Sequence, residues 1–365
     1  MNQPKQPRLP LDNHSWYTML VAGLLLLAAF FRLWGLSSIP TGMHPDELIN
    51  AQLADLIREG RGLVIFTQVE PAREALYHVY LAATTTVTGR GLFLWRLPTV
   101  WLSLLTLALT TRLLRRMFGV RVALMALALL AVAFWPVWLG RVALHVVLMP
   151  LIAVAVIYPT YRAFQAKTMA GQGLWFTLAG LALGFSQYTH VTSWTLWVIF
   201  LLYVGYQVVV FSEDAGEQWF NVLYTIALAG VLSLPLFIFL IFNPGAREVA
   251  SLAEQTGLLA ELPSRLLATV AALPLRGDLY AGHNIPGRPV LGPFLAGLMA
   301  IGIGVSFARW RDPPHFLALL WLAIGLIPTA FLPNQPDFEF MAVALPVVFI
   351  FPAIGLRAIY QVILE

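Results

Sequence analysis

The stretch WYTMLVAGLLLLAAFFRLWGL, residues 16–36, is apolar except for Thr18 and Arg32. A helix needs about 20 consecutive apolar residues to cross a bilayer, and this stretch supplies them. It is followed at residues 42–62 by GMHPDELINAQLADLIREGRG, the most polar run in the first half of the chain. The pair of stretches predicts a membrane-spanning helix that delivers a polar loop to one membrane face.

The composition supports a membrane location. Of the 365 residues, 59% are hydrophobic and 11% are charged, whereas a soluble domain averages roughly 25% charged residues. A soluble protein of this composition would expose large apolar patches and aggregate. Cysteine is absent, which excludes disulfides, thiolate metal sites and cysteine nucleophiles. The net charge of +4 comes from dispersed arginines, so we expect no nucleic-acid partner.

Apolar segments of spanning length recur along the whole chain. Because lipid admits only helices or closed barrels, we expect an all-α polytopic bundle of about 10–11 transmembrane helices. Segment 75–91 is short and polar enough that we expect it to enter the membrane without crossing. Gly302 and Gly304 lie inside an apolar segment, where they predict close helix packing. The expected segments are 16–36, 75–91, 96–112, 120–139, 142–161, 173–189, 191–211, 221–242, 290–308, 315–332 and 338–359.

Basic residues in short loops predict the orientation. Lys5 and Arg8 precede the first span, which places the N-terminus in the cytoplasm. Arg309 with Arg311, and Arg357, mark later cytoplasmic ends. We therefore expect one membrane domain, 1–365, in the cell inner (cytoplasmic) membrane, without a soluble domain. The loops expected on the exterior, or periplasmic, face are 37–74, 186–193, 244–289 and 333–337.

Each of the two long exterior loops predicts an amphipathic juxtamembrane helix. In the first, Pro45 suits a first helical turn, and Asp46 and Glu47 suit its positive end. Apolar residues then repeat at helical spacing up to Gly60, which gives a helix that lies on the membrane. A similar pattern opens the second loop, 244–289, before turn-forming residues take over.

The ionisable residues of these loops predict group-transfer chemistry. A carboxylate near the interface can take a proton from an acceptor hydroxyl, and nearby arginines can hold a phosphate. Asp46 is the leading candidate base, while Glu47 is also explained by its helix N-terminus. A carboxylate together with arginines suits the transfer of a group from a phosphate-bearing lipid to a hydroxyl. Composition alone equally permits a transporter or a scaffold subunit. The other polar candidates are His44, Glu74, Arg96, Arg141, His190, His283 and Arg288.

Five short motifs, in order, resemble those of lipid-carrier-dependent glycosyltransferases of the GT-C fold, the protein O-mannosyltransferase-like group called glycosyltransferase family 39. HPDE follows the first span, like that family's acidic first-loop motif, and EALY is similar to its Glu-Pro-Leu-Tyr element. The resemblance covers roughly residues 15–360. The motifs are HPDE at 44–47, EALY at 74–77, RLPT at 96–99, RVAL at 141–144 and HNIPGRP at 283–289.

The resemblance implies a mechanism. Asp46 would be the catalytic base and Glu74 a second acidic residue of the site. The donor would be a polyprenyl-phosphate sugar on the exterior face, transferred with inversion to a hydroxyl of an unspecified acceptor. Arg141 or Arg288 would contact the phosphate, and His44 with Asp46 could supply two ligands to a divalent cation.

The departures from the family pattern keep an alternative open. Ala75 stands where that family has Pro, Gly140 where Ser is common, and Glu70-Pro71 is a competing acidic match. The chain also ends at Glu365, soon after the last apolar segment. These features favour, as the alternative, a non-catalytic GT-C-like subunit with partner subunits in a membrane complex.

Overall fold

The computed structural model describes residues 14–61, 74–211, 218–243, 258–332 and 336–364, and every regular element in those ranges is a helix. In chain order the α-helices and 3-10 helices are α1 (His14–Leu33), α2 (Pro45–Arg58), α3 (Leu76–Thr88), α4 (Leu92–Met117), α5 (Val120–Val132), α6 (Phe134–Leu139), η2 (His145–Val147), α7 (Leu148–Ala163), α8 (Met169–Ser186), η3 (Val191–Ser193), α9 (Trp194–Val210), α11 (Trp219–Phe242), α13 (Leu258–Ala271), α14 (Pro293–Ala308), α15 (Pro313–Ala330), η6 (Ala342–Ala344), α16 (Leu345–Val348) and α17 (Ile350–Leu364).

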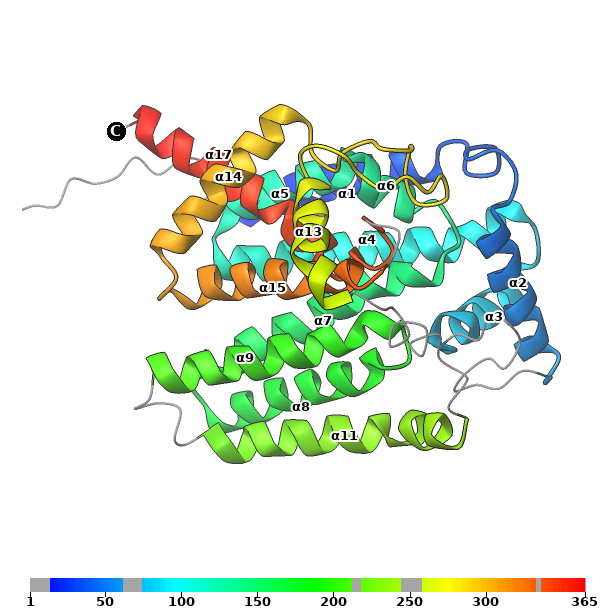
Figure 1. Cartoon of the computed structure of the whole chain (residues 1–365), viewed down its shortest axis with the longest axis horizontal. Coiled ribbons are helices and arrows are strands. Elements are labelled where there is room, and N and C mark those ends of the chain that lie inside the picture. The colour runs from blue at the N-terminus through cyan, green and yellow to red at the C-terminus, as the bar shows by residue number, and fades with distance from the viewer. Residues whose placement is uncertain (1–13, 62–73, 212–217, 244–257, 333–335, 365) are drawn as a thin grey trace, which may run out of the picture.

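The long helices lie side by side and give the molecule two distinct ends (Figure 1). α11 packs on α8 at one edge, α8 packs on α7 and α4 packs on α5, while α14 and α17 pack together on the opposite side. The short helices α2 and α3 lie against each other at one end of the bundle. The C-terminus of α17 lies at the other end (Figure 1).

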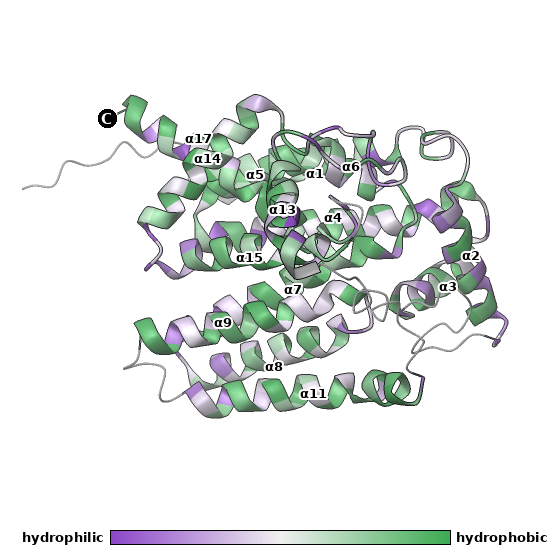
Figure 2. Cartoon of the chain, in the orientation of Figure 1, coloured by the Kyte–Doolittle hydropathy of each residue, from purple (hydrophilic) through white to green (hydrophobic). Residues whose placement is uncertain are grey.

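Seven of the described helices are long and apolar enough to cross a membrane, and the chain is a multi-pass membrane protein. α5 and α14 are apolar but shorter. Green, apolar residues cover α11 in Figure 2, and the side chains of Phe220 and Phe242 on that helix are each 79% exposed. Such surfaces have lipid as their natural solvent.

All eleven expected segments contain helix, which confirms the all-α polytopic architecture. α3 has 13 residues, about 20 Å at 1.5 Å per residue, and is shorter than a hydrocarbon core of about 30 Å. The expected start of the last segment at residue 338 is wrong, because helix resumes only at Ala342. Asp337 Oδ1 accepts hydrogen bonds from the backbone N–H groups of Glu339 and Phe340, which holds a turn there.

Arg32 has a structural role that the sequence analysis did not assign. Its side chain is fully buried, although it lies in the first apolar helix. It donates to the carbonyls of Leu130, Ala131 and Pro136, and to Ser103 Oγ. The helical chain breaks between α5 and α6 at this point, so the Leu130 and Ala131 carbonyls at the end of α5 need partners inside the bundle. The Pro136 carbonyl also accepts from the Gly140 N–H.

Two glycines bring α14 and α17 into backbone contact. A Cβ on Gly302 would lie 2.0 Å from the Phe351 carbonyl oxygen, and a Cβ on Gly355 would lie 2.0 Å from that of Leu298. The close packing predicted at Gly302 is therefore confirmed. The same prediction is wrong for Gly304, where a Cβ would have nothing within 4 Å.

This contrast gives a matched test of the packing. Gly302→Ala should lower the free energy of unfolding by about 1–3 kcal/mol, because the methyl group must push the two helices apart. Gly304→Ala should leave stability unchanged or raise it by up to about 1 kcal/mol, through helix propensity alone. Thermal unfolding midpoints of the two purified variants in detergent measure the difference. Equal midpoints would contradict the contact.

Candidate active site

The acidic motif forms the first turn of α2, as the sequence predicts. His44 is the N-cap, and its Nδ1 accepts a hydrogen bond from the Asp46 backbone N–H at 3.3 Å. Glu47 reaches back so that its Oε2 accepts from the His44 N–H at 3.0 Å. This reciprocal capping fixes the turn and leaves the Asp46 carboxylate, whose side chain is 23% exposed, at the positive end of the helix.

Glu47 also forms a fully buried ion pair with Arg96 of α4. Arg96 Nε donates to Glu47 Oε1 and Arg96 Nη2 to Oε2, each at 2.8 Å, and both side chains are 0% exposed. Glu47 Oε1 further accepts from the Ala143 N–H at 2.9 Å. The remaining Arg96 donors bind the carbonyls of residues 36, 40 and 42. The pair therefore ties α2, α4 and the loop before α2 together.

Arg141 holds the same loop from another side. Its guanidinium donates to the backbone carbonyls of Phe31, Trp34 and Ile39. The sequence predicts substrate binding for Arg96 and Arg141, but the contacts that the structure gives both residues are with the protein. Their shared effect is to set the path of residues 31–42, and with it the position of the His44–Asp46 turn.

A second polar cluster is centred on Glu339, which the sequence analysis did not single out. Its Oε1 lies 3.3 Å from the Nε2 atoms of His145 and His190, and its Oε2 lies 3.1 Å from His283 Nε2. His145 begins η2, His190 directly precedes η3, and His283 lies between α13 and α14. Four loops that are distant in sequence therefore meet at one carboxylate, and all belong to the end of the bundle predicted to carry the polar loops.

His283 is surrounded by carboxylates. Its Nδ1 lies 3.3 Å from Asp278 Oδ2 and 3.6 Å from Asp337 Oδ1. Burial alone would lower the pKa of His283, but Asp278, Glu339 and Asp337 outweigh it and raise that pKa to about 10. Burial raises the pKa of Asp337 to about 6 against the opposing effect of His283. Burial would also raise the pKa of Glu339, but the three histidines hold it well below its usual range. His283 is therefore an imidazolium within the cluster.

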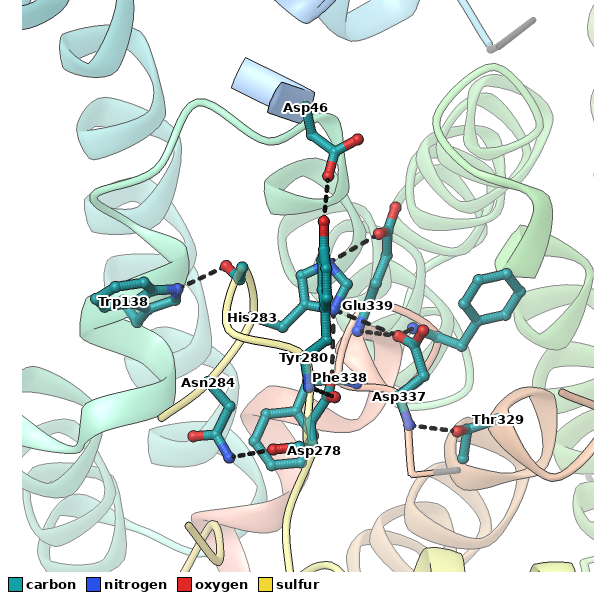
Figure 3. Close-up of polar contacts among 12 residues, drawn as sticks. Asp46, Trp138, Asp278, Tyr280, His283, Asn284, Thr329, Asp337, Phe338 and Glu339 are labelled. Carbon is teal, nitrogen blue, oxygen red and sulfur yellow. Dashed lines mark hydrogen bonds and ion pairs between the residues drawn. The ribbon is translucent and has the colours of Figure 1, made fainter. Parts of the chain in front are cut away.

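Tyr280 joins this cluster to Asp46 (Figure 3). Its Oη lies 3.3 Å from Asp46 Oδ2, to which it donates, and 3.1 Å from His44 Nε2. Because His44 Nδ1 accepts from the Asp46 N–H, neutral His44 carries its proton on Nε2, toward Tyr280. The Tyr280 ring packs edge-on against His283 at 4.8 Å between centroids. A directional hydrogen-bond chain thus runs from His44 through Tyr280 to the Asp46 carboxylate.

Gly282 permits this close approach. The Trp138 Nε1–H of α6 donates to the Gly282 carbonyl at 2.8 Å, which draws the loop inward (Figure 3). A Cβ at Gly282 would lie 2.7 Å from His44 Nε2 and from Tyr280 Cε1. The absence of a side chain at this position therefore lets the 277–289 loop lie directly on the His44–Asp46 turn.

The other predicted site residues are placed as follows. Glu74 is buried just before α3, where the Leu76 N–H donates to the Tyr188 carbonyl, close in sequence to His190. Arg288 is exposed, with its guanidinium carbon 4.5 Å from the centre of the Phe134 ring. Glu70-Pro71 and residues 244–257 of the second loop lie outside the described residues. α13 confirms a helix in the remainder of that loop.

Two residue groups have the composition of a cation site, namely His145 with His190 and Glu339, and Asp278 with His283 and Asp337. In the described structure the histidines of both groups face carboxylates. His190 Nδ1 lies 3.2 Å from the Thr192 backbone nitrogen, which donates to it, and 2.9 Å from Thr192 Oγ1, while its Nε2 faces Glu339. His283 is doubly protonated between its carboxylates, as argued above. The reaction proposed for this chain uses neither group as a metal site.

Comparison with known proteins identifies the architecture. Neither a protein-family model nor a curated protein sequence matches the chain. Solved structures do match: ArnT from Cupriavidus metallidurans superposes with a TM-score of 0.66 at 16% identity, over 95% of this chain and 60% of ArnT. The archaeal oligosaccharyltransferase AglB from Archaeoglobus fulgidus superposes with a TM-score of 0.63 at 13% identity, over 97% of this chain and 51% of AglB. The chain has the GT-C fold.

The protein O-mannosyltransferase complex Pmt1–Pmt2 from S. cerevisiae is a more distant GT-C match, with a TM-score of 0.50 at 20% identity over 61% of this chain and 33% of that one. The chain thus spans less than two thirds of the length of each of these GT-C proteins. At such identities the likeness establishes the fold.

The charge on His283 predicts a pH dependence of stability. Because its folded pKa is raised from 6.5 to about 10, its contribution is complete below pH 6.5 and is lost as the pH rises through about 10. Asp337 and Glu339 remain ionised across pH 7–10, so His283 titrates without them. The free energy of unfolding of the wild type should exceed that of His283→Asn by about 2 kcal/mol at pH 7. At pH 10.5 the difference should be much smaller. A difference in unfolding midpoint that does not change with pH would contradict this assignment.

Proposed function

We propose that this chain is a membrane glycosyltransferase that moves a sugar from a polyprenyl-phosphate carrier to an acceptor hydroxyl, with Asp46 as the catalytic base. The observation that carries the proposal is the placement of Asp46. A partly exposed carboxylate stands at a fixed helix N-terminus, beside a cluster assembled from four distant loops. Perturbed ionisable groups collected in this way are characteristic of functional sites.

The GT-C neighbours support the choice of donor. ArnT has been solved bound to undecaprenyl phosphate, AglB with a dolichol-phosphate and an inhibitory peptide, and Pmt1–Pmt2 bound to its sugar donor. By analogy of fold, this chain takes a lipid-linked sugar at the polar end of its bundle.

The proposed chemistry is a single displacement. Asp46 accepts the proton of the acceptor hydroxyl as its oxygen attacks the anomeric carbon, and the bond from that carbon to the phosphate oxygen breaks. The electron pair leaves with the polyprenyl phosphate, and the configuration at the anomeric carbon inverts. Tyr280 and His44 act as positioning residues that orient the Asp46 carboxylate. Glu74 is proposed as a second acidic residue of the site.

Arg288 is the better candidate to hold the departing phosphate. Within the described residues no carboxylate lies within 4.0 Å of its guanidinium, and the side chain is exposed beside α6. Arg141 has two of its nitrogens engaged by backbone carbonyls. We assign Arg96 and Arg141 to positioning through the loop before α2, and Arg288 to contact with the donor.

The orientation proposal follows from the arginines at the far end of the bundle. Arg115 and Arg116 lie in the last turn of α4, and Arg309 follows α14. Basic residues mark the cytoplasmic side of short loops. The site therefore faces the exterior of the cell inner membrane, where polyprenyl-linked sugars can enter sideways from the bilayer.

Asp46→Asn should lower the transfer rate by about 10²–10⁴-fold, because the amide cannot accept the proton. Asp55→Asn, on the same helix, is the matched control, because within the described residues Asp55 forms ion pairs with Arg58 and Arg90, away from Asp46. The assay measures release of polyprenyl phosphate from a panel of polyprenyl-phosphate hexoses and pentoses in liposomes, with unfolding midpoints recorded for each variant. Full activity in Asp46→Asn would refute the proposal that Asp46 is the catalytic base. Donor binding without turnover in the wild type would favour the non-catalytic subunit.

A further inference from the structure

The end of the bundle opposite Asp46 contains a cavity that the proposed reaction does not use. Its volume is about 310 Å³, and its walls come from the α4–α5 junction, the end of α14, the start of α15 and α17. A water occupies about 30 Å³ of liquid, so the space exceeds a single-ion site and has room for a polar head of several atoms.

Positive charge converges on this cavity. Arg309 and Arg357 both line it. Arg357 Nη1 donates to the Phe118 carbonyl at 2.6 Å, which fixes the guanidinium at the wall. Arg121 lies beside them, with its guanidinium carbon 5.4 Å from the Tyr360 ring centre, one turn along α17 from Arg357.

These arginines form no ion pair with an acid in the described residues. Arg121, Arg309 and Arg357 have no carboxylate within 4.0 Å there. Asp312 does not line the cavity, although its charge acts on His315, which does. Like charges that converge without an acid destabilise the fold unless an anion joins them, so the cavity is suited to an anionic ligand.

The remaining wall selects a ligand with an apolar part. Val122, Val305 and Ile354 line the same cavity. Val362 at the end of α17 also lines the cavity and is 79% exposed, and Phe307 of α14 is 63% exposed. Trp310, which is half exposed beside Arg309, is the kind of residue that lies at the headgroup level of a membrane.

We propose that this cavity binds the headgroup of an anionic phospholipid, with its phosphate between Arg309 and Arg357 and its first acyl carbons against the apolar wall. Basic pockets between transmembrane helices recognise lipid phosphates in this way. A soluble phosphate compound would use the arginines but would leave the apolar wall and the adjoining lipid-exposed surface without a partner. The site is independent of Asp46, so its failure would leave the proposed transfer reaction untouched.

The test titrates purified full-length protein in detergent with dioctanoyl phosphatidylglycerol and follows binding by native mass spectrometry. Arg309→Gln should weaken binding about tenfold, as expected for the loss of one charge-assisted contact. Arg311→Gln is the matched control, because Arg311 lies in the same loop but over the Trp310 ring and outside the cavity. Arg357→Gln should weaken binding similarly. The unfolding midpoint of this variant shows whether loss of the hydrogen bond to the Phe118 carbonyl also destabilises the fold.

The choice of lipid and the choice of anion separate the alternatives. Dioctanoyl phosphatidylcholine should bind at least about tenfold more weakly than phosphatidylglycerol, and millimolar inorganic phosphate should not displace the lipid. Equal binding of the two lipids, or equal loss in Arg309→Gln and Arg311→Gln, would overturn the proposal. Tight, Arg309-dependent binding of inorganic phosphate that excludes the lipid would assign the cavity to a soluble anion instead.

Discussion

The buried ion pair between Glu47 and Arg96 is the interaction on which the site depends. Two charges taken out of water cost several kcal/mol each unless nearly all their hydrogen-bonding groups are satisfied. Here the Glu47 carboxylate also accepts from the His44 and Ala143 N–H groups, and the Arg96 guanidinium also donates to three carbonyls of the 36–42 loop. Since any displacement of α2 would leave a buried charge unpaired, the turn that carries Asp46 has one well-defined position.

A second constraint acts from the opposite side of Asp46. Glu339 and the imidazolium of His283 draw the 277–289 loop and the turn before η6 together, and Tyr280 extends from that loop to the Asp46 carboxylate. The two clusters have different tasks. The Glu47–Arg96 pair is dry and rigid, whereas the Tyr280 contact is partly exposed and can be exchanged for a substrate hydroxyl. A site that must admit a lipid-borne donor needs this combination of a fixed base and an accessible face.

Much of this arrangement follows from local sequence, and the rest does not. Pro45, Asp46 and Glu47 mark a helix start because their preferences act within one turn, and the eleven apolar segments mark helices for the same reason. The partners of Arg32, Arg96 and Arg141 are backbone carbonyls distant in sequence, and no spacing rule identifies such carbonyls. Glu339 was missed because the expected apolar segment 338–359 includes it. Two acidic residues, Asp337 and Glu339, at that boundary were the available signal, since acids at a membrane edge require a partner.

The most direct test of this account is the removal of the Glu47 charge. Glu47→Gln should lower the free energy of unfolding by about 3–5 kcal/mol, because it leaves Arg96 buried without its anion. In the fraction that folds, it should also lower sugar transfer, because Asp46 loses its fixed position. Glu59→Gln, which alters an exposed pair with Arg61 just beyond the same helix, should change neither quantity. A Glu47→Gln protein with wild-type stability and wild-type transfer would contradict the claim that this ion pair positions the base.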